Sequence, residues 1–460
     1  MIRRGGAWGQ GEQPKAGEPR YTIRMLAFLR RMRIETEDWL RYSPFVRNLI
    51  GRYKSWREPR TVPQDDDEVV RSISRLCAVT RLLDSPGRIR KVEEQILERV
   101  AKLDWTKVDW REFIAKVDTA SIPRAAILKP YLGPREPGVV YIGFEIEWMR
   151  FLRSLTLPAR QFADRYTLIV APSSSPYNPV NFIFPAAYGT PLYSLINHDE
   201  DTEILRRVSP NYCVVPMYTS HWVNPAIYQP RPRSERDIDI LMVAAWGKVK
   251  RHHLLFNASQ RMPKSLKVVL IGQDQDGRTQ ETMRREAGWY GVADRFEMWS
   301  NASHAQVREA FCRAKISLLL SLREGSAVVV PESLFADTPV GLLHNAYNGS
   351  RGFINEQTGR LLHERNLAGQ LTEFLANADC CMPRAWAEAN ITCFRSSERL
   401  NEMLKRDALA EGREWTRDIF PVCWQPDPRL VNADDWRSLR AERADIQGRF
   451  GVLLGPEEIV

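Results

Sequence analysis

The chain has 460 residues, more than one hydrophobic core usually accommodates, which predicts two domains with extensions. Its apolar content of 43% and charged content of 27% are typical of a globular protein, and no apolar run approaches the ~20 residues that span a bilayer. The net charge of +9 is concentrated in residues 1–60, which hold fourteen Lys and Arg against six Asp and Glu. A nucleic-acid-binding protein would spread basic residues over a folded face, so this class of function is not favoured.

Residues 1–60 are interpreted as a basic N-terminal extension. Around position 28, basic and apolar side chains are interleaved: Arg24, Met25, Leu26, Phe28, Leu29, Arg30, Arg31 and Arg33. One interpretation is a helix packed on the main body with a solvated basic face, and the other is a basic amphipathic helix on an anionic membrane surface. The first 15 residues lack the apolar core of a signal peptide, and the seven cysteines show no C-x-x-C spacing. We therefore expect a cytoplasmic protein, with peripheral binding to the inner face of the cell membrane as the alternative.

Residues 61–230 show a helical start and then an alternating pattern. Apolar spacing of three and four predicts helices over 68–83 and 88–103. From about residue 124, strands are predicted at 125–128, 139–142, 168–171, 191–196 and 213–215, with helices at 145–155 and 201–207. This alternation predicts a mostly parallel sheet covered by helices, that is, a first Rossmann-like domain with leading helices.

A Pro- and charge-rich linker at 225–237 precedes a second alternating unit, assigned to residues 231–378. Its predicted strands are 238–243, 267–271, 295–298, 316–320, 340–343 and an edge strand at 359–362. Its predicted helices are 254–262, 279–290, 304–313 and 367–376. Residues 379–460 are assigned to C-terminal helices, including 384–405, that return to the first domain, and the tail from 408 has no clear pattern. The expected fold class is therefore α/β, with two doubly wound domains facing an interdomain cleft.

The segment from Glu324 to Glu332 places two carboxylates eight residues apart, across the turn from a buried strand into a helix. Pro331 is tolerated only in the first turn of a helix, so the helix is expected to start near Val328. Open α/β sheets bind ligands at the carboxyl ends of their strands. This segment is therefore the candidate functional site.

Two further polar elements are expected at the same edge. Lys248, Lys250 and Arg251 follow the strand 238–243, and Gly272 ends the next strand, where no side chain would block a flat group.

A nucleotide diphosphate needs cations, a helix N-terminus for its phosphate and a carboxylate for its ribose. Lys250 and Arg251 are the candidate cations, and Glu332 is the candidate ribose ligand. Glu324 is left to face the group attached to the phosphate. The backbone expected to cradle the β-phosphate is that of Gly325, Ser326, Ala327 and Val328.

The "KR" after the first strand, the "IG" ending the second, "SLREGSAVVVPESLFADTPV" and "INEQTGRLL" together resemble the retaining glycosyltransferases of family 4. The resemblance covers about residues 238–378 and implies the GT-B fold and a nucleotide-sugar donor. By it, Glu324 contacts the donor sugar, Glu332 the ribose and Lys250 the diphosphate. Members often carry an arginine five residues before this lysine. Here that position is Ala245, so the phosphate binding that the arginine would provide is expected to fall to Lys248 or Arg251 instead.

In the first domain, "PLYSLINHDED" resembles the strand-then-histidine element of the same family, although Asn197 intervenes before His198. The resemblance then implies that His198 lies near the donor sugar and stabilises the transition state. It also implies retention of configuration, with the leaving diphosphate taking the acceptor proton, and neither a metal nor a cofactor. The donor sugar, its base and the acceptor (a glycan, polysaccharide, glycolipid, protein or small molecule) are not identified.

Two other functions stay open. A non-catalytic GT-B protein that binds a nucleotide sugar is favoured by Ala245 in place of the family arginine. A nucleotide-sugar epimerase of the same fold is the other alternative, although epimerases of this fold lack the paired glutamates. The Ser173 to Pro176 loop is either part of an acceptor site or an ordinary loop.

Overall fold

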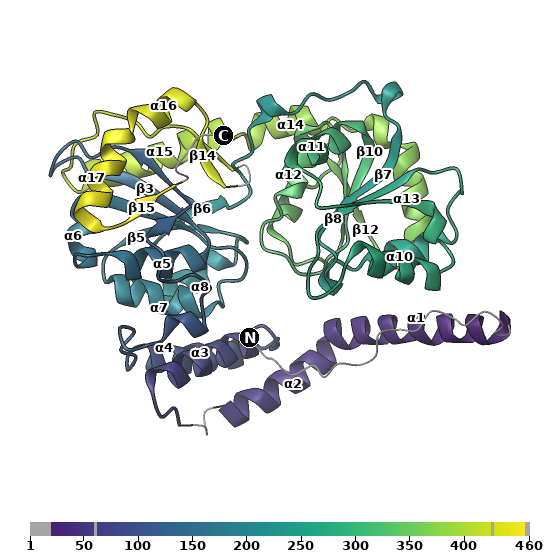
Figure 1. Cartoon of the computed structure of the whole chain (residues 1–460), viewed down its shortest axis with the longest axis horizontal. Coiled ribbons are helices and arrows are strands. Elements are labelled where there is room, and N and C mark those ends of the chain that lie inside the picture. The colour runs from purple at the N-terminus through teal and green to yellow at the C-terminus, as the bar shows by residue number, and fades with distance from the viewer. Residues whose placement is uncertain (1–19, 59–61, 425–426, 456–460) are drawn as a thin grey trace.

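The computed structural model describes residues 20–58, 62–424 and 427–455, and these form two lobes (Figure 1). The first lobe is built on a five-stranded sheet in the order β2-β3-β4-β5-β6. Its strands are β2 (Ala125–Lys129), β3 (Gly138–Gly143), β4 (Tyr166–Ala171), β5 (Leu192–Ile196) and β6 (Tyr212–Tyr218). Neighbours from β3 to β6 are parallel, and only the edge strand β2 is antiparallel to its neighbour. The strands read as continuous apolar runs because both faces of the sheet are covered.

Helices cover this sheet and extend it towards the N-terminus. They are α3 (Asp66–Thr80), α4 (Pro86–Val100), α5 (Glu145–Ser154), α6 (Ala159–Ala163), α7 (Pro179–Tyr188) and α8 (Asp201–Val208). The helix α7 was not predicted because its sequence PVNFIFPAAY is apolar on nearly every side and has no amphipathic period. Its start is set by Asn178, whose side chain accepts a hydrogen bond from the Val180 amide.

The second lobe has a six-stranded, fully parallel sheet in the order β12-β11-β10-β7-β8-β9. Its strands are β7 (Ile238–Val243), β8 (Val268–Gly272), β9 (Phe296–Ser300), β10 (Ala314–Leu319), β11 (Val340–Leu343) and β12 (Gly359–Leu362). Its helices are α9 (His252–Ser259), α10 (Gln280–Trp289), α11 (His304–Arg313), α12 (Val329–Phe335) and α13 (Leu367–Ala376). The helix α12 begins at Val329, as Pro331 indicated, and β12 is an edge strand. The two lobes are the two Rossmann-like domains of a GT-B fold.

Apart from the N-terminal helices, the chain crosses between the lobes twice. After α14 (Pro383–Asn390), which packs on α12, the helix α15 (Cys393–Ala410) returns to the first lobe. The predicted helix 384–405 is thus two helices, and the second starts where Thr392 Oγ1 accepts from the Arg395 amide at 3.1 Å. The Cys393 amide donates to the Val223 carbonyl at 3.0 Å, so the two crossings run side by side.

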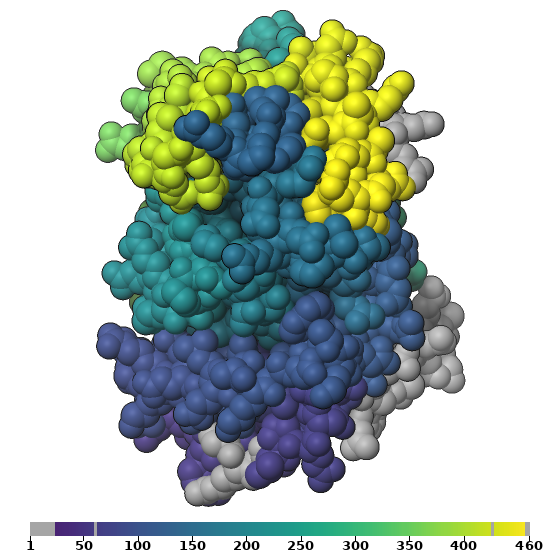
Figure 2. All heavy atoms as spheres, turned by 90° about the vertical axis from the view of Figure 1, so that its left-hand side faces the viewer, coloured from purple at the N-terminus to yellow at the C-terminus, as the bar shows by residue number. Residues whose placement is uncertain are grey.

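The C-terminal tail packs on the first lobe. It contains β13 (Val422–Trp424), β14 (Pro428–Leu430), α16 (Ala433–Ser438), α17 (Arg440–Phe450) and β15 (Leu453–Leu454). Leu400, Trp436 and Phe450 belong to the hydrophobic core of that lobe, and β15 pairs with β1 (Ser121–Ile122). Figure 2 shows this yellow segment at the upper right of the lobe.

The N-terminal helices α1 (Arg20–Tyr42) and α2 (Pro44–Arg57) join the two lobes on another side (Figure 1). The helix α1 packs against α10 of the second lobe, where the Arg31 guanidinium lies 4.8 Å from the ring centre of Tyr290. The helix α2 packs on α3 of the first lobe, with Gly51 against Leu82 and Leu83. Among the described residues, none of the helices is long and apolar enough to cross a membrane.

Candidate functional site

Three of the predicted site residues meet where the strands of the two lobes end. Lys250 follows β7, Glu324 follows β10, and His198 follows β5 of the other lobe. The Lys250 ammonium forms an ion pair with the Glu324 carboxylate, and the two side chains keep 20% and 17% of their exposure. His198 Nε2 lies 3.0 Å from the Glu324 carbonyl oxygen. The site therefore combines a cation, a carboxylate and an imidazole from both lobes.

His198 is held in a defined state. A carbonyl oxygen only accepts hydrogen bonds, so the contact with Glu324 places a proton on Nε2. Burial lowers the pKa of His198 to about 4, which keeps the ring neutral at physiological pH. The ring stacks on Tyr347 with 3.8 Å between ring centres. Asp201 Oδ2 accepts from the amides of Asn197 and His198 at 2.9 and 3.0 Å, which fixes the turn that presents the imidazole.

The helix-start backbone expected to bind phosphate contacts the first lobe in this structure. The Ser326 amide donates to Asn197 Oδ1 at 3.1 Å, and the Ser326 hydroxyl is hydrogen-bonded to that of Ser220. The Asn197 Nδ2 group in turn donates to the carbonyl oxygens of Ser174 and Pro172 at 2.7 and 3.0 Å. In the sequence, Asn197 stands out only as an interruption before His198. In the structure its side-chain oxygen accepts the hydrogen bond from the Ser326 N–H that a bound anion would otherwise accept.

The two lobes approach each other here backbone to backbone. A Cβ atom on Gly325 would lie 2.8 Å from the Ser173 carbonyl oxygen, and one on Gly349 would lie 1.6 Å from that of Asn197. The Gly349 amide also donates to the Gly325 carbonyl at 2.9 Å. Only glycine fits at Gly349, so this contact between the lobes depends on that residue type.

Glu332 lies in the first turn of α12 and is half-buried. Burial raises the pKa of its carboxyl to about 7, against the opposing influence of the Tyr228 hydroxyl and the Arg308 guanidinium. Within the described residues no hydrogen bond joins Glu332 to Glu324 or Lys250. It is therefore a separate carboxylate of the same segment, and its assignment to the ribose stays a prediction.

Two of the predicted cations are held by α1 rather than left open. Lys248 Nζ donates to Glu37 at 2.6 Å. The Arg251 guanidinium, 3% exposed, lies between Asp38, with contacts down to 2.6 Å, and Glu364, at 2.8 and 3.0 Å. These carboxylates raise the pKa of Arg251 further above its already high value. The expectation that Arg251 offers its charge to a phosphate stays a prediction, because in this structure its donors join α1 to the second lobe.

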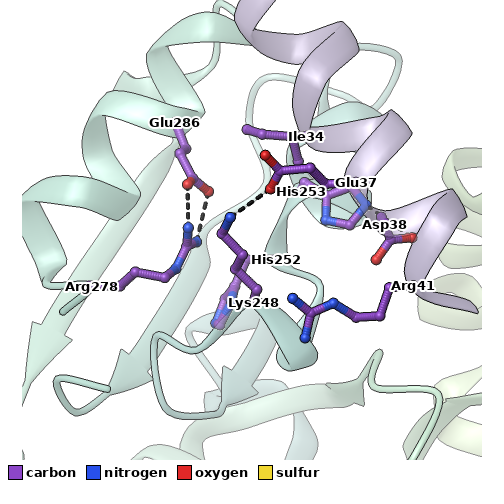
Figure 3. Close-up of a pocket in the computed structure, with 9 residues that line it drawn as sticks. All are labelled: Ile34, Glu37, Asp38, Arg41, Lys248, His252, His253, Arg278 and Glu286. Atoms are coloured by element: carbon purple, nitrogen blue, oxygen red, sulfur yellow. Dashed lines mark hydrogen bonds and ion pairs between the residues drawn. The ribbon is translucent and has the colours of Figure 1, made fainter. Parts of the chain in front are cut away.

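Figure 3 shows the contact between α1 and the loop that carries Lys248. A cavity of about 30 Å³ lies there, lined by Ile34, Glu37, Asp38, Arg41, Lys248, His252, His253, Arg278 and Glu286. The Arg278 guanidinium in its wall is paired with Glu286. The cavity has room for about one water molecule, so it marks the edge of the helix contact rather than a ligand site.

Gly272 has a different role from the one expected. A Cβ atom at this position would lie 2.7 Å from the ring of Trp246, which is fully buried. The glycine therefore makes room for an indole of the protein itself, and the flat group at the end of β8 is Trp246. No pattern around Gly272 indicates this contact, because Trp246 follows a different strand.

Residues 224–391 match the family model described as glycosyl transferases group 1. Sucrose-phosphate synthase from Thermosynechococcus elongatus is similar to this chain at 15% identity and a TM-score of 0.46, over 72% of this chain and 82% of that one. The pneumococcal O-GlcNAc transferase GtfA, in complex with UDP and GlcNAc, is similar at 14% identity and a TM-score of 0.42, over 60% of this chain and 57% of that one. HepE from Anabaena, in complex with UDP, is similar at 11% identity and a TM-score of 0.46, over 70% of this chain and 85% of that one. At these values the structural likenesses carry no argument about activity, and no curated protein sequence matches.

The family match covers all of the second lobe's sheet and ends next to the two crossings between the lobes. It also contains Lys250, Glu324 and Glu332, whereas His198 lies before it. Residues 224–391, which make up most of the second lobe, are therefore similar to the group 1 glycosyl transferases.

Proposed function

We propose that this glycosyltransferase moves a sugar from a nucleotide-diphosphate donor to an acceptor, with retention of the anomeric configuration. The observation that supports this most directly is the Lys250–Glu324 ion pair at the strand ends, with His198 of the other lobe against it. An ammonium and a carboxylate in one half-buried place suit a substrate that carries a diphosphate next to sugar hydroxyls.

In the proposed reaction the donor separates this ion pair. The Lys250 ammonium turns to the diphosphate, and the Glu324 carboxylate accepts hydrogen bonds from the sugar hydroxyls. As the glycosidic bond to the phosphate breaks, negative charge grows on the diphosphate, and Lys250 and the amides of Ser326, Ala327 and Val328 stabilise it. The leaving diphosphate takes the acceptor proton, and neither a metal nor a cofactor is assigned a role.

His198 acts on this chemistry as a neutral group. Its Nε2–H contact with the Glu324 carbonyl couples the position of Glu324 to closure of the lobes. We place its ring edge next to the sugar, where it stabilises the transition state. Glu332 is proposed to bind the ribose, and Lys248 to join the diphosphate when Glu37 releases it.

Binding of the donor requires Asn197 to leave the Ser326 amide, because one N–H donates well to one acceptor at a time. The donor is therefore proposed to enter an opened form, and the lobes then close on it. Such closure excludes water from the diphosphate as it leaves.

The test begins with thermal unfolding in the presence of uridine, guanosine and adenosine diphosphates and their sugars. A ligand at a hundred times its Kd adds about 2.7 kcal/mol of stability, so one base should raise Tm clearly. The matching sugar nucleotide is then supplied with candidate acceptors, and NMR reads the anomeric configuration of the product. Glu324→Gln should keep the shift and lose transfer, while Glu356→Gln, an exposed glutamate of the same lobe, should keep both. An inverted product, or full turnover by Glu324→Gln, would contradict the proposal.

A second candidate is a GT-B protein that binds a nucleotide sugar without turnover. Two observations favour it: Ala245 stands where the related enzymes carry arginine, and Arg251 is enclosed by Asp38 and Glu364. The same experiment separates the two functions. A Tm shift that depends on Glu332, with no product from any acceptor and no release of nucleoside diphosphate, is the result expected of a binding protein.

A further inference from the structure

The helices α1 and α2 expose an unusual amount of apolar surface. Most of the exposed large apolar side chains in the described residues belong to them: Met25, Leu26, Phe28, Leu29, Met32, Trp39, Leu40, Phe45, Leu49, Ile50, Tyr53 and Trp56. Apolar patches of this kind mark interaction surfaces when they are contiguous.

The apolar side chains of α1 form one stripe, and that stripe faces away from the protein. Met25, Phe28, Leu29, Met32 and Trp39 follow one another along one exposed side of the helix, with the polar Thr36 between the last two. The opposite face, with Ile34 and Asp38, is the one that contacts the second lobe. A surface helix normally packs its apolar stripe against the protein, whereas α1 turns this stripe to the solvent and packs with its polar face.

The helix α2 repeats this arrangement. Phe45, Leu49, Tyr53 and Trp56 are spaced by four, four and three residues and lie on one exposed face. Gly51, on the other face, is buried against Leu82 and Leu83. The two stripes belong to consecutive helices that run along one side of both lobes (Figure 1).

The charges of the two helices are sorted in the same way. Their carboxylates are turned to the protein: Glu37 to Lys248, Asp38 to Arg251 and Glu58 to Arg75, while Glu35 lies next to Tyr290. The exposed basic side chains away from these contacts are Arg24, Arg33, Arg52, Lys54 and Arg57, whereas Arg30 lies over the Trp289 ring and Arg41 lines the cavity beside Lys248. The outward side is therefore apolar and positively charged.

We propose that the outward face of α1 and α2 binds the surface of an anionic lipid bilayer, with the apolar stripes at the headgroup boundary and the basic side chains among the lipid phosphates. Trp39, Tyr53 and Trp56 have the amphipathic rings that favour this depth. A second copy of the chain is disfavoured as the occupant, because it would bring one positive face against another. This proposal does not depend on the reaction proposed above.

The experiment is flotation of the full chain with vesicles. One set of vesicles is phosphatidylcholine alone, and in the other a third of the lipid is phosphatidylglycerol. The chain should float with the second set, and less so as salt rises, because screening weakens attraction to the lipid charge. Phe28→Ser together with Trp39→Ser should lower the partition coefficient about a hundredfold, since each large apolar side chain buried is worth about a factor of ten. Arg24, Arg52 and Lys54 changed to Gln should also lower it about a hundredfold, at about 1 kcal/mol for each charge.

The matched control is Phe394→Ser together with Leu409→Ser, because these side chains are equally exposed but lie on α15. Circular dichroism and Tm establish that each variant folds, which is expected for exposed positions. The proposal fails if the full chain does not float with anionic vesicles, if it floats equally well with phosphatidylcholine alone, or if the α15 control loses binding as strongly. It also fails if sedimentation shows a dimer that Phe28→Ser with Trp39→Ser dissociates, since the stripe would then be a surface for a second copy.

Discussion

At the scale of single residues, the Lys250–Glu324 pair decides how the site is interpreted. Each group stabilises the charge of the other in a half-buried position, so removal of one leaves the other uncompensated. A single substitution therefore changes stability as well as chemistry. The two effects must be separated before either residue is assigned a role in the reaction.

Lys250→Met should lower kcat by about 10²–10³, because one lost donor to a developing anion costs about 3–4 kcal/mol in the transition state. Lys264→Met, an exposed lysine of the same lobe, should leave kcat unchanged. The double variant Lys250→Met with Glu324→Gln should regain the Tm lost by the single one and stay inactive. If the double variant also regains activity, the pair is structural only.

Glu332 makes donor binding depend on pH. Its pKa is raised to about 7 by burial, so the carboxylate that would accept ribose hydroxyls is fully formed only above that pH. The nucleoside diphosphate that raises Tm should therefore bind more tightly at pH 8 than at pH 6, by up to about tenfold for each pH unit below the pKa. Isothermal titration calorimetry at both values measures this. Glu332→Gln should remove the pH dependence and Glu356→Gln should keep it, so an unchanged slope in Glu332→Gln rules out this origin.

The same shift has a consequence for stability. The folded chain binds a proton at Glu332 between its ordinary pKa of 4.5 and about 7, whereas the unfolded chain has released it. The contribution of Glu332 to the free energy of unfolding therefore falls as pH rises through this window. The free energy of unfolding of Glu332→Gln should therefore fall less steeply with pH over the same window than that of the unchanged chain.

At the scale of elements, the second lobe was the easier to predict. Its parallel strands are short apolar runs between amphipathic helices, so β7 and β11 and the helices α11 and α13 have the bounds that the pattern indicated. The tail after residue 408 had no such period, because its short elements pack one by one on an existing lobe.

Sequence patterns did not predict the contacts of Arg251, Gly272 and the Ser326 amide, for another reason. Their partners are Asp38, Trp246 and Asn197, which are distant in sequence or follow another strand. The "KR" motif predicted correctly that cations lie after β7. It did not indicate that α1 would bind two of them.

The docking of α1 can be tested at Asp38. Asp38→Asn should weaken the contact with Arg251 by about 2 kcal/mol, because hydrogen bonds between charged groups are lost. Hydrogen exchange in residues 20–58 should then become faster, while β7 and β10 stay protected. Glu35→Gln is the matched control, since Glu35 receives a long hydrogen bond of 3.4 Å from the Tyr290 hydroxyl of the second lobe. Equal exchange in both variants would mean that Asp38 does not hold the helix.

At the scale of the whole molecule, the lobes are joined on two sides. The two crossings near Val223 and Cys393 lie side by side, and α1 and α2 connect the lobes elsewhere (Figure 1). Between them, the backbone at Gly349 meets the backbone at Asn197. If the lobes open to admit the donor, this contact must separate while the crossings stay intact. A single methyl group added at the contact should therefore prevent the lobes from closing.

Gly349→Ala should hold the lobes apart. The added Cβ would lie 1.6 Å from the Asn197 carbonyl oxygen, far inside van der Waals contact, and relief requires the lobes to separate or the loop to shift. Gly352→Ala is the control within the same turn, because its Cβ would meet nothing closer than 3.6 Å. Small-angle X-ray scattering should give a larger radius of gyration for Gly349→Ala than for Gly352→Ala, with sugar transfer lost in the first and kept in the second. Because the contact between His198 and Glu324 joins the two lobes, their separation should break it, and this loss should appear in kcat more than in nucleotide affinity. Normal turnover by Gly349→Ala with an enlarged radius would show that the chemistry does not need the closed contact, and His198 would then have no role in it.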